Sequence, residues 1–129
     1  MANEKERWLA EAEEDLRTAE VLLEQGRYSA SAFYSQQSAE KALKSVLYGL
    51  HQAPWGHAVV ELLERVAQGR PGPEVSELAP CARLLDRHYI GARYPNAYPS
   101  GTAAAHYDPG TAQEAIECAN RFLELSKRL

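Results

Sequence analysis

The sequence lacks several features that would place the protein at a membrane or outside the cell. No apolar run approaches the roughly 18 residues that a membrane-spanning helix needs. The first residues, MANEKERW, are charged and lead into a helical pattern, so we expect no secretory signal. The net charge of −4 gives no overall attraction to nucleic acid or to anionic lipid. A site for either would therefore have to be local, and we expect no membrane association.

Cysteine is also scarce. Cys81 and Cys118 are the only two in 129 residues, which is too few for a disulfide framework. We expect both to be reduced thiols packed in helix cores, as is typical of a cytoplasmic protein. The four histidines, at positions 51, 57, 88 and 106, lack the spacing of paired metal ligands, and neither cysteine has a CxxC partner. The sequence predicts neither a metal site nor a cofactor.

Proline and glycine are missing from residues 28–48, the stretch around which the chain is organised. Apolar and small residues recur there at helical spacing, in steps of four and three: Ala32, Gln36, Ala39, Leu43, Val46 and Leu50. Because further apolar side chains, such as Phe33 and Leu47, lie outside this stripe, more than one face must be covered. The pattern predicts the central helix of a bundle, with Phe33 and Leu43 in the core.

The rest of the chain reads as further helices and one long loop. Helices are expected over residues 4–25, 57–68, 74–89 and 111–128, with Asn3, Gly26 and a Thr111–Glu114 capping box marking ends. Pro80 lies inside the third of these, so its first turn is expected to be separate or kinked. Residues 90–110 hold three tyrosines, three glycines and three prolines; their aromatic content favours an ordered loop. We predict one all-α domain over residues 1–129: an up-and-down bundle of four to five helices with a long ordered loop before the last helix.

The central helix carries the polar sequence Gln36-Gln37-Ser-Ala-Glu40-Lys41-Ala-Leu-Lys44. Glu40 and Lys44 form an i,i+4 pair in the favourable order, which is compatible with an ordinary solvated helix edge. Gln36, however, falls on the apolar stripe, where a buried amide needs a hydrogen-bond partner. Both interpretations stay open from the sequence. His57 follows the turn after this helix, and we expect it to cap or pack against the next one.

The long loop opens with Arg93-Tyr94-Pro95-Asn96. An arginine, an aromatic ring and an asparagine on a proline-stiffened turn could hold a phosphate and stack a base. The alternative is a structural role, in which Arg93 pairs with Asp86 or Glu40. The sequence does not decide between the two.

Arg83 and His88 form a second pair of interest, with the spacing Arg-x4-His. Arginine can hold a phosphate and histidine can transfer a proton, a combination suited to RNA cleavage. On one helix, residues five apart point about 140° from each other. The two would therefore have to meet across a dimer.

Taken together, the motifs resemble the HEPN family, whose name stands for higher eukaryotes and prokaryotes nucleotide-binding domain. The resemblance covers about residues 8–126 and rests on a long first helix followed by FYSQQSAEKALKSVL, then Gly56-His57 opening a helix, then LDRHYIGARYPNAY. It implies a four- to five-helix bundle that is usually a homodimer. Prokaryotic members are commonly paired with a minimal nucleotidyltransferase in two-component modules, many of them toxin and antitoxin.

The resemblance also bears on activity. Ribonuclease members of the family carry an Arg-x4–6-His motif just past the fourth helix. Arg93 matches that arginine, but Tyr98, Pro99 and Ser100 stand where the histidine would be. The chain is therefore similar to a branch that binds nucleotide or a partner, with a metal-independent dimeric ribonuclease through Arg83 and His88 as the alternative. The expected ligand-binding residues are Arg93, Tyr94, Asn96, Lys41, Lys44 and His57.

Overall fold

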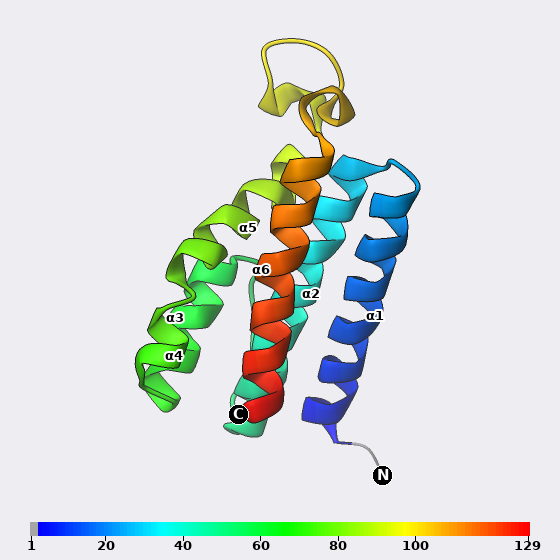
Figure 1. Ribbon diagram of the computed structural model, residues 1–129. Coiled ribbons are helices and arrows are strands. Elements are labelled where there is room, and N and C mark those ends of the chain that lie inside the picture. The colour runs from blue at the N-terminus through cyan, green and yellow to red at the C-terminus, as the bar shows by residue number, and fades with distance from the viewer. Residues whose placement is uncertain (1–2) are drawn as a thin grey trace.

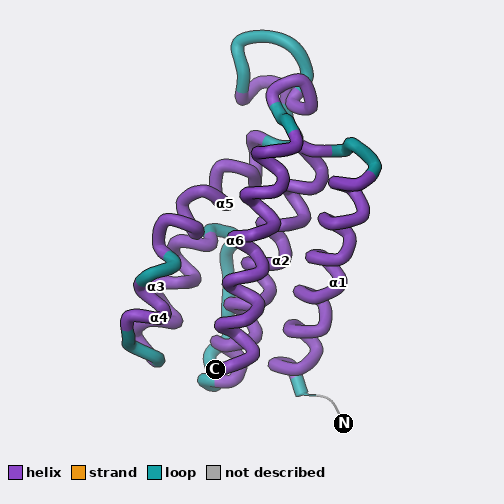
Figure 2. The backbone as a smooth tube through the Cα atoms, viewed as in Figure 1, coloured by secondary structure: helices purple, strands orange, loops and turns teal. Residues whose placement is uncertain are grey.

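A computed structural model describes residues 3–129, and all regular structure within that range is helical (Figures 1 and 2). Five helices exceed ten residues: α1 (Glu4–Glu24), α2 (Tyr28–Gly49), α3 (Val59–Gly69), α5 (Ala79–Gly91) and α6 (Pro109–Arg128). The short elements are α4 (Pro73–Ser76) and the 3₁₀ helices η1 (Pro95–Ala97) and η2 (Ala103–His106). The predicted all-α bundle is confirmed.

Helix α2 lies in the middle of the bundle, with α1 and α6 packed along it (Figure 1). Leu43 and Leu47 are completely buried there, and Phe122 of α6 packs in the same core. Small residues let α1 approach closely: the hydroxyls of Ser31 and Ser38 donate to backbone carbonyls of α1, each at 2.7 Å. The central position predicted for this helix follows from having apolar or small side chains on several sides.

The helix ends agree with the sequence at α1 and differ at α6. Asn3 Oδ1 accepts from the Glu6 amide at 2.9 Å, and Gly26 takes the left-handed conformation (φ +75°) that ends α1 and opens the turn to α2. At α6 the predicted Thr111 cap is wrong. Asp108 caps the helix instead, accepting from the Thr111 amide at 2.7 Å, because Pro109 can occupy the first helical position.

Between α2 and α3 the chain returns along α2 without forming a helix (Figure 2). The amide of Gln36, in α2, donates to the His57 carbonyl at 3.0 Å and so fixes this segment against α2. The expected helix 74–89 is divided as Pro80 suggested: α4 ends at Ser76, and α5 begins at Ala79 with Pro80 as its second residue. The loop between α5 and α6 lies at one end of the bundle, where Tyr98 and Tyr107 are half-buried.

Candidate functional site

Arg93 lies just beyond the end of α5, with three aromatic rings around its guanidinium. The guanidinium carbon is 4.5 Å from the ring centre of Phe33, 4.7 Å from that of Tyr89 and 5.0 Å from that of Tyr94. We call these four residues the Arg93 cluster. Tyr89 lies one helical turn before Arg93, so the two share a face of the helix, while Phe33 comes from α2. Cation–π contacts of this kind are worth about 0.5–2 kcal/mol each and hold the guanidinium in place.

Arg93 has no carboxylate partner within residues 3–129, so the predicted alternative of pairing with Asp86 or Glu40 is wrong. Asp86 instead accepts from the first amides of α3, those of Val59 at 2.7 Å and Val60 at 3.1 Å. The Arg93 Nε donates to the Tyr89 carbonyl at 2.7 Å. A guanidinium has five N–H donors; the four on the two terminal nitrogens of this exposed side chain have no hydrogen-bond partner in residues 3–129.

His57 lies beside the cluster. Its ring stacks on the Tyr89 ring with centres 5.0 Å apart and planes 15° apart, and its side chain is 60% exposed. Its Nδ1 is 3.2 Å from the Glu40 carboxylate, which is buried. Because a carboxylate only accepts, Nδ1 carries the shared proton, and Nε2 has no hydrogen-bond partner in residues 3–129. Tyr89 thus contacts both the Arg93 guanidinium and the His57 imidazole.

Glu40 belongs to a buried polar network, which decides between the two sequence interpretations of this stretch. Its other oxygen pairs with Lys44 Nζ at 3.1 Å, and both side chains are more than nine-tenths buried. The buried Gln36 amide is hydrogen-bonded at both atoms: its nitrogen donates to the His57 carbonyl, and its oxygen accepts from the Gln37 amide at 2.7 Å. The interpretation as a solvated helix edge is therefore wrong for Glu40 and Lys44. Through the Glu40 carboxylate and the Gln36 amide, this buried network holds His57 against α2.

The remaining expected ligand-binding residues are Lys41, Lys44 and Asn96. Lys41 pairs with Asp15 of α1 at 2.7 Å, and Lys44, besides Glu40, lies 5.5 Å from the Trp8 ring centre. Asn96 is exposed in η1. Of the six residues, the structure brings together Arg93, Tyr94 and His57. Lys41 lines a separate surface groove with residues of α1.

Arg83 and His88 do not converge within one chain. Arg83 is exposed, whereas only 6% of His88 is accessible, and its Nδ1 lies 2.7 Å from the Tyr107 hydroxyl. Burial, and secondarily the positive charge of Arg87, lower the pKa of His88 to about 4. The His88 imidazole is therefore neutral near pH 7.

A polar cavity of about 320 Å³ lies next to His88, between α5, the long loop and α6. Tyr98 donates to the Gly91 carbonyl at 2.9 Å, and its ring stacks on His106 at 4.0 Å. Burial raises the pKa of Tyr107, so that hydroxyl stays protonated. These contacts tie the long loop to the end of α5, from which Arg93 projects.

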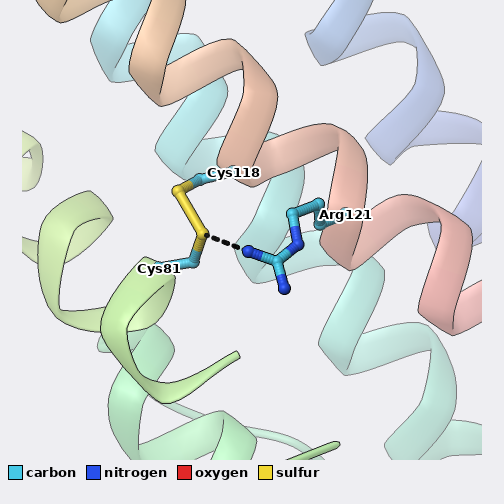
Figure 3. Close-up of a disulfide and its surroundings, with 3 residues drawn as sticks. All are labelled: Cys81, Cys118 and Arg121. Atoms are coloured by element: carbon cyan, nitrogen blue, oxygen red, sulfur yellow. Dashed lines mark hydrogen bonds between the residues drawn. A yellow bond between two sulfur atoms is a disulfide. The ribbon is translucent and has the colours of Figure 1, made fainter. Parts of the chain in front are cut away.

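The cysteines correct the sequence analysis. Cys81 of α5 and Cys118 of α6 form a disulfide, with Cα atoms 5.3 Å apart, where reduced thiols had been expected (Figure 3). The Arg121 guanidinium lies 3.6 Å from the Cys81 sulfur. No spacing signal in the sequence marks this bond, because the two cysteines are 37 residues apart and meet only through helix packing.

The described part of the chain shows no metal centre and no membrane span. Within residues 3–129 no group of three or more His, Cys, Asp or Glu side chains is placed to hold a metal ion. No helix in that range is both long and apolar enough to cross a membrane.

Comparison with known proteins agrees with this architecture. The HEPN domain profile matches residues 5–129. The chain belongs to the HEPN domain family. This HEPN chain is 37% identical to TT1696 from Thermus thermophilus, whose crystal structure superposes with a TM-score of 0.93 and 98% of both chains covered. For ST0689, an archaeal HEPN homologue of known structure, the identity is 34%, the TM-score is 0.81 and 98% of both chains is covered.

A third relative carries a functional name. The protein called "Putative toxin MJ1304", from Methanocaldococcus jannaschii, is 30% identical over 128 residues, covering 93% of this HEPN chain and 84% of its own. That name applies to the relative.

The sequence predicted Arg93, Tyr94 and His57 as binding residues, but it did not identify the side chains that hold them in position. Tyr89 could have been found, since it stands four residues before Arg93 and both belong at the end of one helix. Phe33 was assigned to the core, whereas it is half-buried at the surface beside Arg93. The role of Glu40 depends on the segment that returns along α2, for which the sequence holds no periodic signal.

Proposed function

We propose that this HEPN chain is the binding component of a two-component, toxin–antitoxin-like pair that works with a minimal nucleotidyltransferase protein. Membership of the HEPN family and the name of the M. jannaschii relative support the context. The pairing with a nucleotidyltransferase comes from the resemblance of the sequence to prokaryotic two-component members. The role proposed for this chain is binding of a nucleotide.

The Arg93 cluster and His57 form the proposed binding surface. The observation that carries this proposal is an exposed guanidinium held by three rings, whose terminal N–H groups have no hydrogen-bond partner and no carboxylate beside them in residues 3–129. A guanidinium edge of this kind binds a phosphate through two parallel hydrogen bonds. Tyr94, which is 45% exposed, offers a ring face on which a base can stack. His57, on the same Tyr89 ring, adds a second group able to contact phosphate.

The alternative, a ribonuclease using Arg83 and His88, has weaker support. A general base must reach the proton it abstracts, but His88 is buried and bonded to Tyr107. With a pKa of about 4, it is also a poor proton acceptor at neutral pH. Convergence of the two residues across a dimer would need His88 to leave this site.

A homodimer is part of the same proposal. Ile90 and Tyr94 are 49% and 45% exposed, next to each other at the end of α5. Exposed large apolar side chains that cluster in this way often mark an interface, and the family resemblance points the same way. Light scattering at micromolar concentration should give about twice the 14.3 kDa of one chain; a monomer would rule the homodimer out.

The binding proposal is tested by titrating the protein with adenosine triphosphate, and with adenosine as the phosphate-free comparison. Arg93→Ala should weaken binding of the triphosphate by about 1–3 kcal/mol, the usual worth of charged hydrogen bonds, and should lower the melting temperature only modestly, because the cation–π contacts that it removes lie at an exposed site. Arg93→Lys should recover only part of the lost affinity, because lysine keeps the positive charge but lacks the planar guanidinium that forms two parallel hydrogen bonds. Arg83→Ala is the matched control: it removes one exposed arginine from α5 and should leave binding unchanged.

Other outcomes separate the alternatives. If the parent binds no nucleotide and Arg93→Ala melts much lower, Arg93 is structural, and only binding of a protein partner is left. If the parent cleaves labelled RNA in EDTA and His88→Ala abolishes the cleavage, the ribonuclease alternative replaces the proposal.

A further inference from the structure

The disulfide joins two helices at chemically different positions. Cys81 is the third residue of α5 (Ala79–Gly91), while Cys118 lies in the middle of α6 (Pro109–Arg128). Both residues are only 7% exposed and belong to the main hydrophobic core. The two sulfurs therefore share a bond but experience different surroundings.

The surroundings of Cys81 favour negative charge on its sulfur. The Arg121 guanidinium approaches the Cys81 sulfur to 3.6 Å, as Figure 3 shows. Cys81 also lies in the first turn of α5, where the unpaired amides and the helix dipole give a positive end, and no side chain caps that end. Both effects favour the thiolate over the thiol, whereas burial, which the two cysteines share, acts against it. Cys118, in a helix interior, lacks the second effect.

We propose that Cys81 is a thiol–disulfide exchange site, with Cys118 as its resolving cysteine and Arg121 as the residue that stabilises the Cys81 thiolate. In the reduced protein, the Cys81 thiolate attacks one sulfur of a small disulfide, forms a mixed disulfide and releases one thiolate. Cys118, losing its proton to solvent, then attacks the Cys81 sulfur, forms the Cys81–Cys118 bond and releases the second thiolate. One disulfide is thereby reduced to two thiols, and the protein dithiol is oxidised.

The groove beside Arg121 indicates which small disulfides react. Arg121 lines a groove of about 220 Å³ between α6 and the segment formed by α4 and the two residues that precede α5. Its charged residues are Glu74, Glu77, Arg121, Glu124 and Arg128, and Arg128 lies 3.7 Å from Glu74. The carboxylates outnumber the arginines, so a cationic disulfide should approach more readily than an anionic one. Arg121 itself is exposed, and its flexible side chain is what a reagent must displace to reach the sulfur.

The first experiment uses the parent protein, reduced with dithiothreitol and desalted. Alkylation by iodoacetamide, followed by mass spectrometry of each cysteine at several pH values, should show Cys81 reacting faster than Cys118 near pH 7. Arg121→Gln should slow Cys81 by about three- to four-fold, the net effect of a tenfold smaller thiolate fraction and a more nucleophilic thiolate. Arg17→Gln, which removes an arginine from the exposed face of α1, is the matched control and should leave the rate unchanged.

The second experiment follows the exchange itself. In Cys118→Ser, cystamine should leave a stable mixed disulfide on Cys81, whereas in the reduced parent it should restore the internal bond. Oxidised glutathione, which is anionic, should carry out both reactions more slowly than cystamine. Equal alkylation of the two cysteines, no effect of Arg121→Gln, or a disulfide that dithiothreitol does not open in the folded parent would each overturn the proposal. The parent measurements need no substitution, so they decide the question even if Cys118→Ser folds poorly.

Discussion

Glu40, buried in the middle of the bundle, places its carboxylate 3.2 Å from Nδ1 of His57, an imidazole exposed at the surface. One interior carboxylate thus orients a surface group that lies beside the Arg93 cluster. Its second oxygen holds Lys44, so the same residue satisfies a buried cation. Stability of the bundle and geometry of the candidate site are therefore coupled through one side chain.

Glu40→Gln tests this coupling. The substitution keeps the shape of the side chain but leaves Lys44 buried without a counter-charge, and breaking a buried pair in this way costs about 3–5 kcal/mol. We expect the free energy of unfolding, measured by urea denaturation, to fall by about that amount. Glu14→Gln is the control, since Glu14 pairs with Arg17 at 3.0 Å on an exposed face, where such a pair is worth about 0–1 kcal/mol. Equal effects of the two changes would mean that the buried pair contributes no more than an exposed one.

His88 makes stability depend on pH. Its pKa is about 4 in the folded protein and about 6.5 when exposed, so the unfolded chain binds a proton more readily between these values. The stability that this residue contributes is complete above about pH 6.5 and is lost as the pH falls toward 4. Linkage gives a loss of about 2 kcal/mol between pH 8 and pH 5. Urea denaturation at both pH values measures it.

The control for this prediction compares substitutions at two histidines, one buried and one exposed. His88→Asn should remove the loss that His88 causes, whereas His51→Asn should retain it. His51 is exposed and has φ +61°, a conformation that asparagine tolerates. A pH dependence that survives in His88→Asn would assign the effect to another group.

Leu43 and Phe33 should respond differently to truncation. Leu43 is completely buried, so Leu43→Ala should destabilise by about 2–5 kcal/mol. Phe33 is half-buried and packs against Arg93, so Phe33→Ala should cost less, about 1–2 kcal/mol, while it weakens ligand binding by loosening the guanidinium. Urea denaturation and nucleotide titration of both variants measure the two effects. If Leu43→Ala weakened binding as much as Phe33→Ala did, the assignment of Phe33 to the site would be wrong.

The sequence predicted the fold well because a bundle is specified by local signals. The apolar periodicity of α2, the cap at Asn3, the glycine at 26 and the position of Pro80 are all readable over a few residues. The signal for the cap of α6 is also local, because Asp108-Pro109 is a recognisable helix start, although Thr111 was predicted as the cap. Helix existence was predicted more reliably than helix ends.

The site was harder to predict because it is built from contacts distant in sequence. Arg93 meets Phe33 of a different helix, and Glu40 meets His57 only because residues 50–58 return along α2 without a periodic pattern. Charge pairing was also ambiguous: Arg93, Lys41 and Lys44 look alike as cations in sequence, yet both lysines are neutralised by carboxylates and the arginine by none in residues 3–129. Which cations are free to bind a ligand is a property of packing.

The disulfide also has a topological consequence for the long loop. The chain between Cys81 and Cys118 contains most of α5, the entire loop with Arg93 and Tyr94, and the first half of α6. A protease that cuts this loop once would therefore produce two pieces that stay covalently attached while the bond is intact and separate only under reducing, denaturing conditions. In the oxidised protein, a single cut at the exposed tip would leave every helix tethered to the bundle.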